Sequence, residues 1–429
     1  MAIDVSEHYF LQRIIDKGYN SDIFCAKIIN GSCDTNWNKE YEFFYSRQPN
    51  SLPHVQRLMF RFKGKKGKTA KAGFVNIRSV SDAYEVTETY LVPPKNLCTP
   101  NAFIKCLSPH KAYGETVECV PFVMPESVFG MCIHASIWIC LKILQNQGMV
   151  TEALTIPEIQ LLASGRQYND KQGLPFVQAS RLLRMCRIFA FYVNNEEEEL
   201  SDEQMVMQLY AYVESKLPVI LGVDVANLNW WHTTKHSYHS IVGIGHTMTG
   251  NKVDGFIIHD ESSLPYQTMT EHELLQAWHK PPLRKNSKPI RELLVAVPPE
   301  VSIPFHKVYH GFHETLRTLR DSYGLIEGDV ESYQARPMLI EPSQLFYETR
   351  SICLLRALRE AGMPKYVWAV YFFPEGESSQ NWIGFYARDT TEKSSFVFAY
   401  IRDKRTAMYQ IEGKTYQRWD DKQNRKRIM

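Results

Sequence analysis

Three short apolar segments in the middle third of the chain constrain its fold more than any other feature. They cover residues 219–223, 240–244 and 255–259. A strand that is apolar on both faces is typical of the centre of a sheet that is covered on both sides. The sequence therefore predicts three central strands. The turn around residues 249–251 allows the second and third strands to pair as an antiparallel hairpin.

The chain of 429 residues is long enough for two or three domains. We expect a β-rich N-terminal domain over 1–110, a domain of helices followed by strands over 111–300, and an α+β C-terminal domain over 301–429. Segments rich in β-branched or aromatic residues predict the N-terminal strands. These strands are expected at 22–29, 40–46, 56–63, 72–79 and 83–92, with a connection over 93–109.

Helical spacing and capping residues predict the remaining elements. A helix over 131–147 and a capping box at 155–158 begin the middle domain, where Thr155 is the N-cap and Glu158 closes the box. Further helices are expected at 173–187, 202–215, 270–278, 306–320 and 343–361. The C-terminal strands are expected at 366–373, 382–390, 395–401, 406–411 and 415–419.

Charge argues against a nucleic-acid partner. The formal net charge is only +2, which is too small for a partner that is held mainly by electrostatics. The basic run over 63–71 is interpreted as a solvated hairpin loop, because no aromatic side chains interleave with the lysines to stack on bases. A phosphate or nucleic-acid patch is the lesser interpretation, since the spacing of a phosphate-binding loop is missing.

The first residues, the lack of a long apolar run and the cysteines lead us to expect a cytoplasmic protein. The first residues are charged throughout and lack the apolar block of a signal peptide, and no apolar run is long enough to span a membrane. The nine cysteines are odd in number, scattered and without a CxxC pair. This pattern is typical of reduced thiols rather than of a disulfide framework or a zinc knuckle.

Cys132 stands in the first turn of the helix expected at 131–147. The partial positive charge of a helix N-terminus lowers the pKa of a thiol, and thiolate is the reactive form. The backbone N–H at the same position is free to face a developing oxyanion. Ala135 and Ser136 are small, as close packing of this helix on a sheet requires. On this segment alone, a buried structural cysteine is the favoured interpretation.

His239 and Asp260 change that balance. His239 begins one apolar strand and Asp260 ends the next. If the two strands pair antiparallel, the start of the first lies beside the end of the second. The imidazole and the carboxylate then meet at one end of the sheet, as a general base and the group that orients it.

Other histidines compete for these roles. His232, His236 and His246 are alternative bases, and the first two with His239 suggest a metal, but their loop spacing matches no metal motif. His134 is expected to point away from Cys132, and His259 to the opposite face of its strand from Asp260. A second metal candidate consists of His306, His310 and His313 at helical spacing. Polar helix faces have the same spacing, so no metal or other cofactor is expected.

The order of Cys132, His239 and Asp260 resembles that of the papain-fold cysteine peptidases. It is particularly similar to the branch with the bacterial leader-peptide (bacteriocin-processing) peptidases, over about residues 120–280. The matching segments are the helix starts at 155 and 173, the strands at 216–220, 239–243 and 258–260, and the segment 269–278. The resemblance implies a helix bundle that carries Cys132 and an antiparallel sheet that carries His239 and Asp260.

One position departs from the family pattern. The family usually has a Gln about six residues before the nucleophile as an oxyanion-hole donor, and this chain has Glu126 there. An ionised carboxylate repels an oxyanion, so either another donor such as Ser127 serves, or activity is weakened.

The triad and the resemblance together imply a cysteine peptidase or isopeptidase that cleaves a protein or peptide amide through an acyl-enzyme. The flanking domains are expected to recognise the substrate or a regulatory protein partner. Two alternatives remain open: an acyl transferase with the same triad, and a catalytically inactive papain-like interaction protein.

Overall fold

The computed structural model has a mixed α+β fold with several antiparallel sheets and, in the described part of the chain, eight α-helices. The α+β class predicted from the sequence is confirmed. The described residues are 12, 15–16, 19, 23–30, 55–63, 69–80, 83–112, 115–124, 132–151, 153–164, 174–186, 188–231, 233–279, 289–349, 351–360, 362, 364–377, 381–391, 397–402, 406–411 and 414–419.

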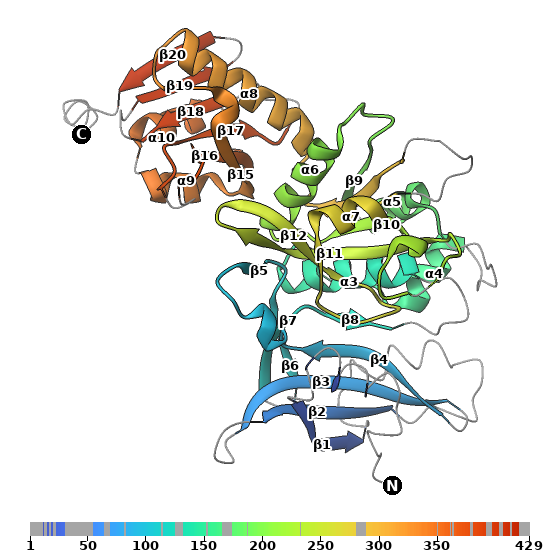
Figure 1. Ribbon diagram of the computed structural model, residues 1–429. Coiled ribbons are helices and arrows are strands. Elements are labelled where there is room, and N and C mark those ends of the chain that lie inside the picture. The colour runs from blue at the N-terminus through green and yellow to red at the C-terminus, as the bar shows by residue number, and fades with distance from the viewer. Residues whose placement is uncertain are drawn as a thin grey trace. The chain divides into compact units, whose positions relative to one another are not determined.

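An antiparallel sheet near the N-terminus confirms four of the five strands predicted there; the fifth, at 40–46, lies outside the described residues. Its strand order is β1-β2-β3-β4-β8 (Figure 1). The core includes Leu58, Phe60 and Val75. Gly73 lies in the left-handed region at φ 128°, where an added Cβ would lie 1.9 Å from the Tyr90 carbonyl oxygen. The strands are β1 (Ile23–Asn30), β2 (Val55–Lys63), β3 (Thr69–Val80), β4 (Ala83–Leu91) and β8 (Phe122–Val123).

The segment predicted as a bare connection over 93–109 begins with irregular chain but also forms strands, which corrects that prediction. β5 (Ala102–Ile104) adds to the central sheet beside β11, and β6 (Ser108–Ala112) pairs with β7 (Glu115–Cys119). Their short length and Pro109 within β6 hide the period-two pattern by which strands are found in a sequence.

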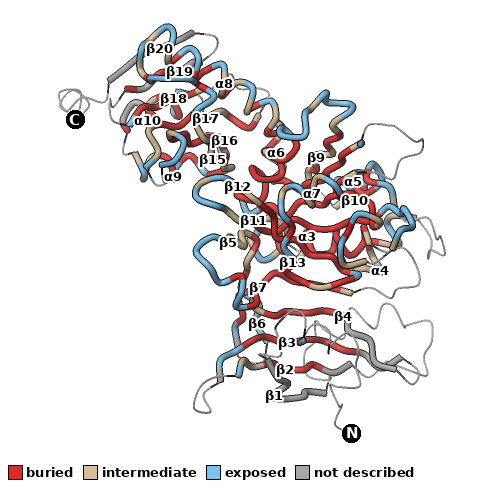
Figure 2. The backbone as a smooth tube through the Cα atoms, in the orientation of Figure 1, coloured by how far each residue is buried: buried red, intermediate tan, exposed pale blue. Residues whose placement is uncertain are grey.

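The three predicted apolar strands lie in the middle of the central sheet, whose order is β13-β12-β11-β10-β14-β9 (Figure 1). Buried residues dominate this part of the chain, shown in red in Figure 2. The sequence prediction missed the two strands beyond β10 and the edge strand β13. The strands are β9 (Phe189–Asn194), β10 (Val219–Asp224), β11 (Tyr238–Thr249), β12 (Lys252–His259), β13 (Gln267–Thr270) and β14 (Glu292–Val297).

Helices in the same part of the chain begin close to the predicted residues. The capping boxes at Thr155 and Thr270 both form, with the N-cap hydroxyl accepting from the N–H of the glutamate three residues on. α3 contacts β10, β8 and α4. The helices are α3 (Cys132–Asn146), α4 (Ile156–Ser164), α5 (Phe176–Met185) and α7 (Glu271–Ala277).

A six-stranded sheet, in the order β15-β16-β17-β18-β19-β20, forms the C-terminal part. One helix was predicted over 343–361, but the chain forms α9 (Pro342–Thr349) and α10 (Ile352–Glu360). Ser351 separates them, and its hydroxyl accepts from the Leu354 N–H as a new N-cap. The other elements are α6 (Asp202–Glu214), α8 (Phe305–Asp321), β15 (Tyr333–Ile340), β16 (Val367–Pro374), β17 (Gly384–Asp389), β18 (Val397–Ile401), β19 (Thr406–Ile411) and β20 (Lys414–Trp419).

The chain forms two compact units. The first comprises Met1–Glu199, Leu217–Thr247 and Gly255–Ala296, and the second comprises Leu200–Lys216, Met248–Asp254 and Val297–Met429. The three domains predicted with boundaries near 110 and 300 stay a prediction. Among the described residues, no helix combines the length and the apolar character that crossing a membrane requires.

Candidate active site

Helix α3 presents a thiol at its first residue. It begins at Cys132, which is half-buried, and the following residues Ile133–Leu141 are buried. Ala135 and Ser136 are fully buried, as the prediction of close helix packing requires. The Ser136 and Ser240 hydroxyls lie 3.1 Å apart and join α3 to β11. Because Ser136 lies one helical turn after Cys132 on the same face, this contact also fixes the thiol against the strand that carries His239.

His239 is the second residue of β11, where it is only 4% exposed. Its strand pairs antiparallel with β10, in the register Val223 with His239. The backbone on this side is therefore held by the ladder, and the imidazole has one fixed environment. The ring of Trp231 lies against it, with ring centroids 5.0 Å apart.

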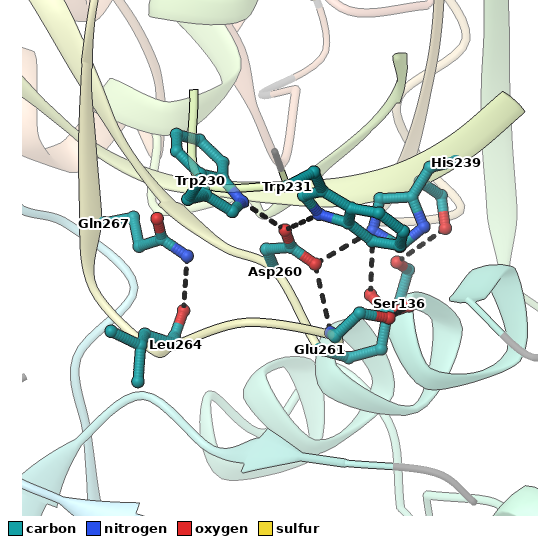
Figure 3. Close-up of polar contacts among 10 residues, drawn as sticks. Ser136, Trp230, Trp231, His239, Asp260, Glu261, Leu264 and Gln267 are labelled. Carbon is teal, nitrogen blue, oxygen red and sulfur yellow. Dashed lines mark hydrogen bonds and ion pairs between the residues drawn. The ribbon is translucent and has the colours of Figure 1, made fainter. Parts of the chain in front are cut away.

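Asp260 follows the last residue of β12, beside the start of β11 (Figure 3). His239 Nε2 lies 2.9 Å from Asp260 Oδ1. The structure thus brings together the two side chains that the hairpin argument places at one end of the sheet. Since Nε2 is held by the carboxylate, the Nδ1 atom is the ring nitrogen left for another partner.

Asp260 is completely buried and is held as an anion by hydrogen-bond donors. Trp230 Nε1 and Trp231 Nε1 donate to Oδ2 at 2.7 and 3.0 Å, and the Ser262 N–H donates to Oδ1 at 3.0 Å (Figure 3). Burial raises the pKa of Asp260, but the charge and hydrogen bond of His239 and the two indoles outweigh burial and leave the pKa lowered. Neither tryptophan was predicted from the sequence as a site residue.

The thiol and the imidazole shift each other's pKa in opposite directions. Burial raises the pKa of Cys132, but hydrogen bonding and charge from His239, with hydrogen bonds from Ser240, leave it lowered. Burial lowers the pKa of His239, but the charges of Glu261 and Asp260 and the hydrogen bonds with Asp260 and Cys132 leave it raised well above its ordinary value. A lowered thiol pKa beside a raised imidazole pKa favours a thiolate–imidazolium pair.

Glu261 is a site residue that the sequence analysis missed. It is 2% exposed, and its Oε2 lies 3.7 Å from His239 Nε2. Burial, opposed by the charge of His239 and reinforced by those of Asp260 and Cys132, raises its pKa to about 8. Its position directly after Asp260 at a strand end was the available signal. An acidic residue at a strand end is most often solvated, which explains why the signal was not used.

A second histidine–carboxylate pair lies near the first. His236 Nδ1 lies 2.6 Å from Asp224 Oδ2, and the His236 side chain is 57% exposed while Asp224 is fully buried. Asp224 also accepts from the Ala226 and Ser237 N–H groups, and His279 Nε2 lies 3.7 Å from it.

The other histidines weighed for the role of general base lie in other surroundings. Burial lowers the pKa of His134 to about 4. His246 stacks on Phe103 and His259 lies between Phe122 and Tyr266, so both sit among aromatic rings. His232 lies outside the described residues, as do the oxyanion candidates Glu126 and Ser127.

The described residues contain one group of three potential metal ligands whose ligand atoms lie close together. It consists of Cys132, His239 and Glu261, with ligand atoms within 4.8 Å of one another. The histidines of α8 do not belong to such a group: the exposed His310 pairs with Glu314 at 3.3 Å, and the His313 ring packs on Tyr309.

No protein-family model matches the chain, and no curated protein sequence matches it significantly.

Proposed function

We propose that this chain is a papain-like cysteine peptidase or isopeptidase that cleaves a protein or peptide amide. The observation that carries the proposal is the grouping of Cys132, His239 and Asp260 at one end of the central sheet, with the pKa of the thiol lowered and that of the imidazole raised. A helix that presents the thiol to an antiparallel sheet carrying the other two residues supports a papain-like architecture.

Each residue then has a chemical role. The Cys132 thiolate attacks the scissile carbonyl, and the imidazolium of His239 gives its proton to the leaving amine. Asp260 accepts from Nε2, so that Nδ1 faces the thiol and the positive ring is stabilised. Water, deprotonated by the now neutral His239, releases the acyl group from the enzyme. The first N–H groups of a helix have no partner within the helix, so those of α3 can face the oxyanion.

An active-site-directed probe tests the nucleophile. The full chain is treated with an acyloxymethyl ketone probe, and the modified residue is located by peptide mapping. We expect one label per chain at Cys132 and none in Cys132→Ala. Cys140→Ala is the matched control from the same helix: burial first, and then Cys106, raises the pKa of that thiol, so labelling should persist. Equal labelling of the Cys132→Ala variant would refute the assignment.

Acyl transfer by the same triad is the alternative that labelling does not separate from hydrolysis. A tryptic peptide mixture is incubated with the chain, with and without added glycinamide, and the products are identified by mass spectrometry. New cleavage products that end in a free carboxylate in both samples support a peptidase. Products that appear only as amides, and only with the added amine, support a transferase.

A further inference from the structure

Glu261 forms a group of three potential metal ligands with the thiol of Cys132 and the imidazole of His239. The sulfur of Cys132, a ring nitrogen of His239 and a carboxylate oxygen of Glu261 all lie within 4.8 Å of one another. Cys132 lies at the start of α3, His239 lies at the start of β11, and Glu261 lies shortly after the end of β12. The packing of α3 on the sheet therefore sets the separation of these atoms, because the three residues are not neighbours in the sequence.

The three ligand types suit zinc. Zn²⁺ binds thiolate, imidazole and carboxylate in tetrahedral geometry at about 2.0–2.3 Å, which places neighbouring ligand atoms about 3.3–3.8 Å apart. Ligand atoms that already lie within 4.8 Å reach these separations by small side-chain rotations. Cys132 is half-buried, so a fourth position facing solvent is left for water.

The surrounding hydrogen bonds orient the ligands for a metal. Asp260 holds His239 Nε2 at 2.9 Å, an arrangement in which a carboxylate fixes the tautomer of a ligating imidazole and raises its basicity. The Ser262 hydroxyl donates to Glu261 Oε1 at 3.1 Å, which leaves Oε2 available as a ligand. A thiolate and a carboxylate also balance the charge of Zn²⁺.

We propose that Glu261 makes the Cys132–His239 pair a three-ligand Zn²⁺ site, through which zinc reversibly silences the peptidase. A thiolate bound to zinc cannot attack a carbonyl. This inference rests on the proposed function for its consequence, but zinc binding itself can be measured separately. It departs from the sequence prediction, which expects no metal.

Zinc protection of the thiol tests the proposal. Alkylation of Cys132 by iodoacetamide is followed by mass spectrometry of the full chain, in EDTA and in increasing zinc. We expect zinc to stop alkylation of the wild type. In Glu261→Gln, which keeps the size of the side chain, the half-protecting zinc concentration should rise by about 10²-fold, because the loss of a ligand weakens metal affinity at least as much as the loss of an outer-shell partner.

His236→Asn is the control, because His236 pairs with the buried Asp224 but does not belong to the group of Cys132, His239 and Glu261. Its half-protecting concentration should match that of the wild type. Cobalt gives a second readout: Co²⁺ should produce a thiolate-to-metal charge-transfer band that Cys132→Ala abolishes.

The outcomes separate this inference from the proposed function. If Cys132 reacts with the peptidase probe in EDTA but zinc does not protect it, the zinc site is refuted and the peptidase proposal stands. If zinc and cobalt bind but the probe does not react in EDTA, the peptidase proposal fails and only the metal site remains. Equal protection in Glu261→Gln, or turnover that needs zinc, would also overturn the inference.

Discussion

Two histidine–aspartate pairs at the same end of β10 and β11 have similar hydrogen-bond lengths and different surroundings. His239 lies 2.9 Å from Asp260, with side chains 5% and 0% exposed, and Trp231 lies on its ring. His236 lies 2.6 Å from Asp224, and its side chain is 57% exposed. The shorter contact belongs to the pair that we do not propose to be catalytic.

The difference shows that a histidine–carboxylate hydrogen bond alone does not identify a general base. Solvent screens the charge of the exposed His236, so that imidazole acts weakly at a distance. The buried pair acts at low effective dielectric on the thiol of Cys132, whose pKa it lowers. Burial and the neighbouring thiol therefore distinguish the two pairs.

The largest expected effect follows from removing each of the two imidazoles in turn. His239→Ala should slow acylation of Cys132 by the peptidase probe about 10³-fold, within the range of general acid–base catalysis, because only the hydrogen bonds from Ser240 then oppose the effect of burial on the thiol. His236→Ala should stay within about twofold of the wild type, as surface changes usually do. Rates are measured under single-turnover conditions. Similar losses in both variants would show that the two pairs are equivalent.

Removing the charge of each carboxylate should change the acylation rates in the same order, but with a smaller difference between the two variants. Asp260→Asn keeps a side chain of the same shape and removes the charge that stabilises the imidazolium, so acylation should slow about 10²-fold. Asp224→Asn should leave the rate within about twofold. Thermal unfolding of both variants shows whether either loss reflects a misfolded chain; a rate loss in Asp224→Asn without unfolding would contradict the comparison.

The smallest effect concerns the indole donors. Trp231→Phe removes one donor to Asp260, which should destabilise the carboxylate and slow acylation about fivefold, equivalent to about 1 kcal/mol. Trp278 donates to the Glu292 carbonyl at 2.8 Å, so Trp278→Phe loses an indole bond away from the triad. It should lower the free energy of unfolding without changing the acylation rate. A rate unchanged in Trp231→Phe would exclude a positioning role.

The backbone framework of the site could be predicted because it follows local rules. The apolar runs at β10, β11 and β12 and the caps at Thr155 and Thr270 specify their elements within short windows. The hairpin then places His239 beside Asp260 by antiparallel geometry.

What could not be predicted depends on single side chains rather than on a repeating pattern. Nothing near Trp231 in the sequence says that it lies against His239, because that contact arises when a loop folds over the ring. β15 was missed because Pro337 within it argues against a strand. The break between α9 and α10 depends on one serine hydroxyl.

The pH dependence of Cys132 alkylation tests the central claim most directly. Thiolate is the species that reacts, so the midpoint of the rate profile reports the pKa of the thiol. Because the pKa is lowered in the folded chain, the thiolate should persist as the pH falls below the ordinary value of 9.0. The folded wild type should therefore show a midpoint below that of Cys132 in the urea-unfolded chain, and folded His239→Ala a midpoint above it, since burial then dominates. A folded wild-type midpoint at or above the unfolded one would contradict the account.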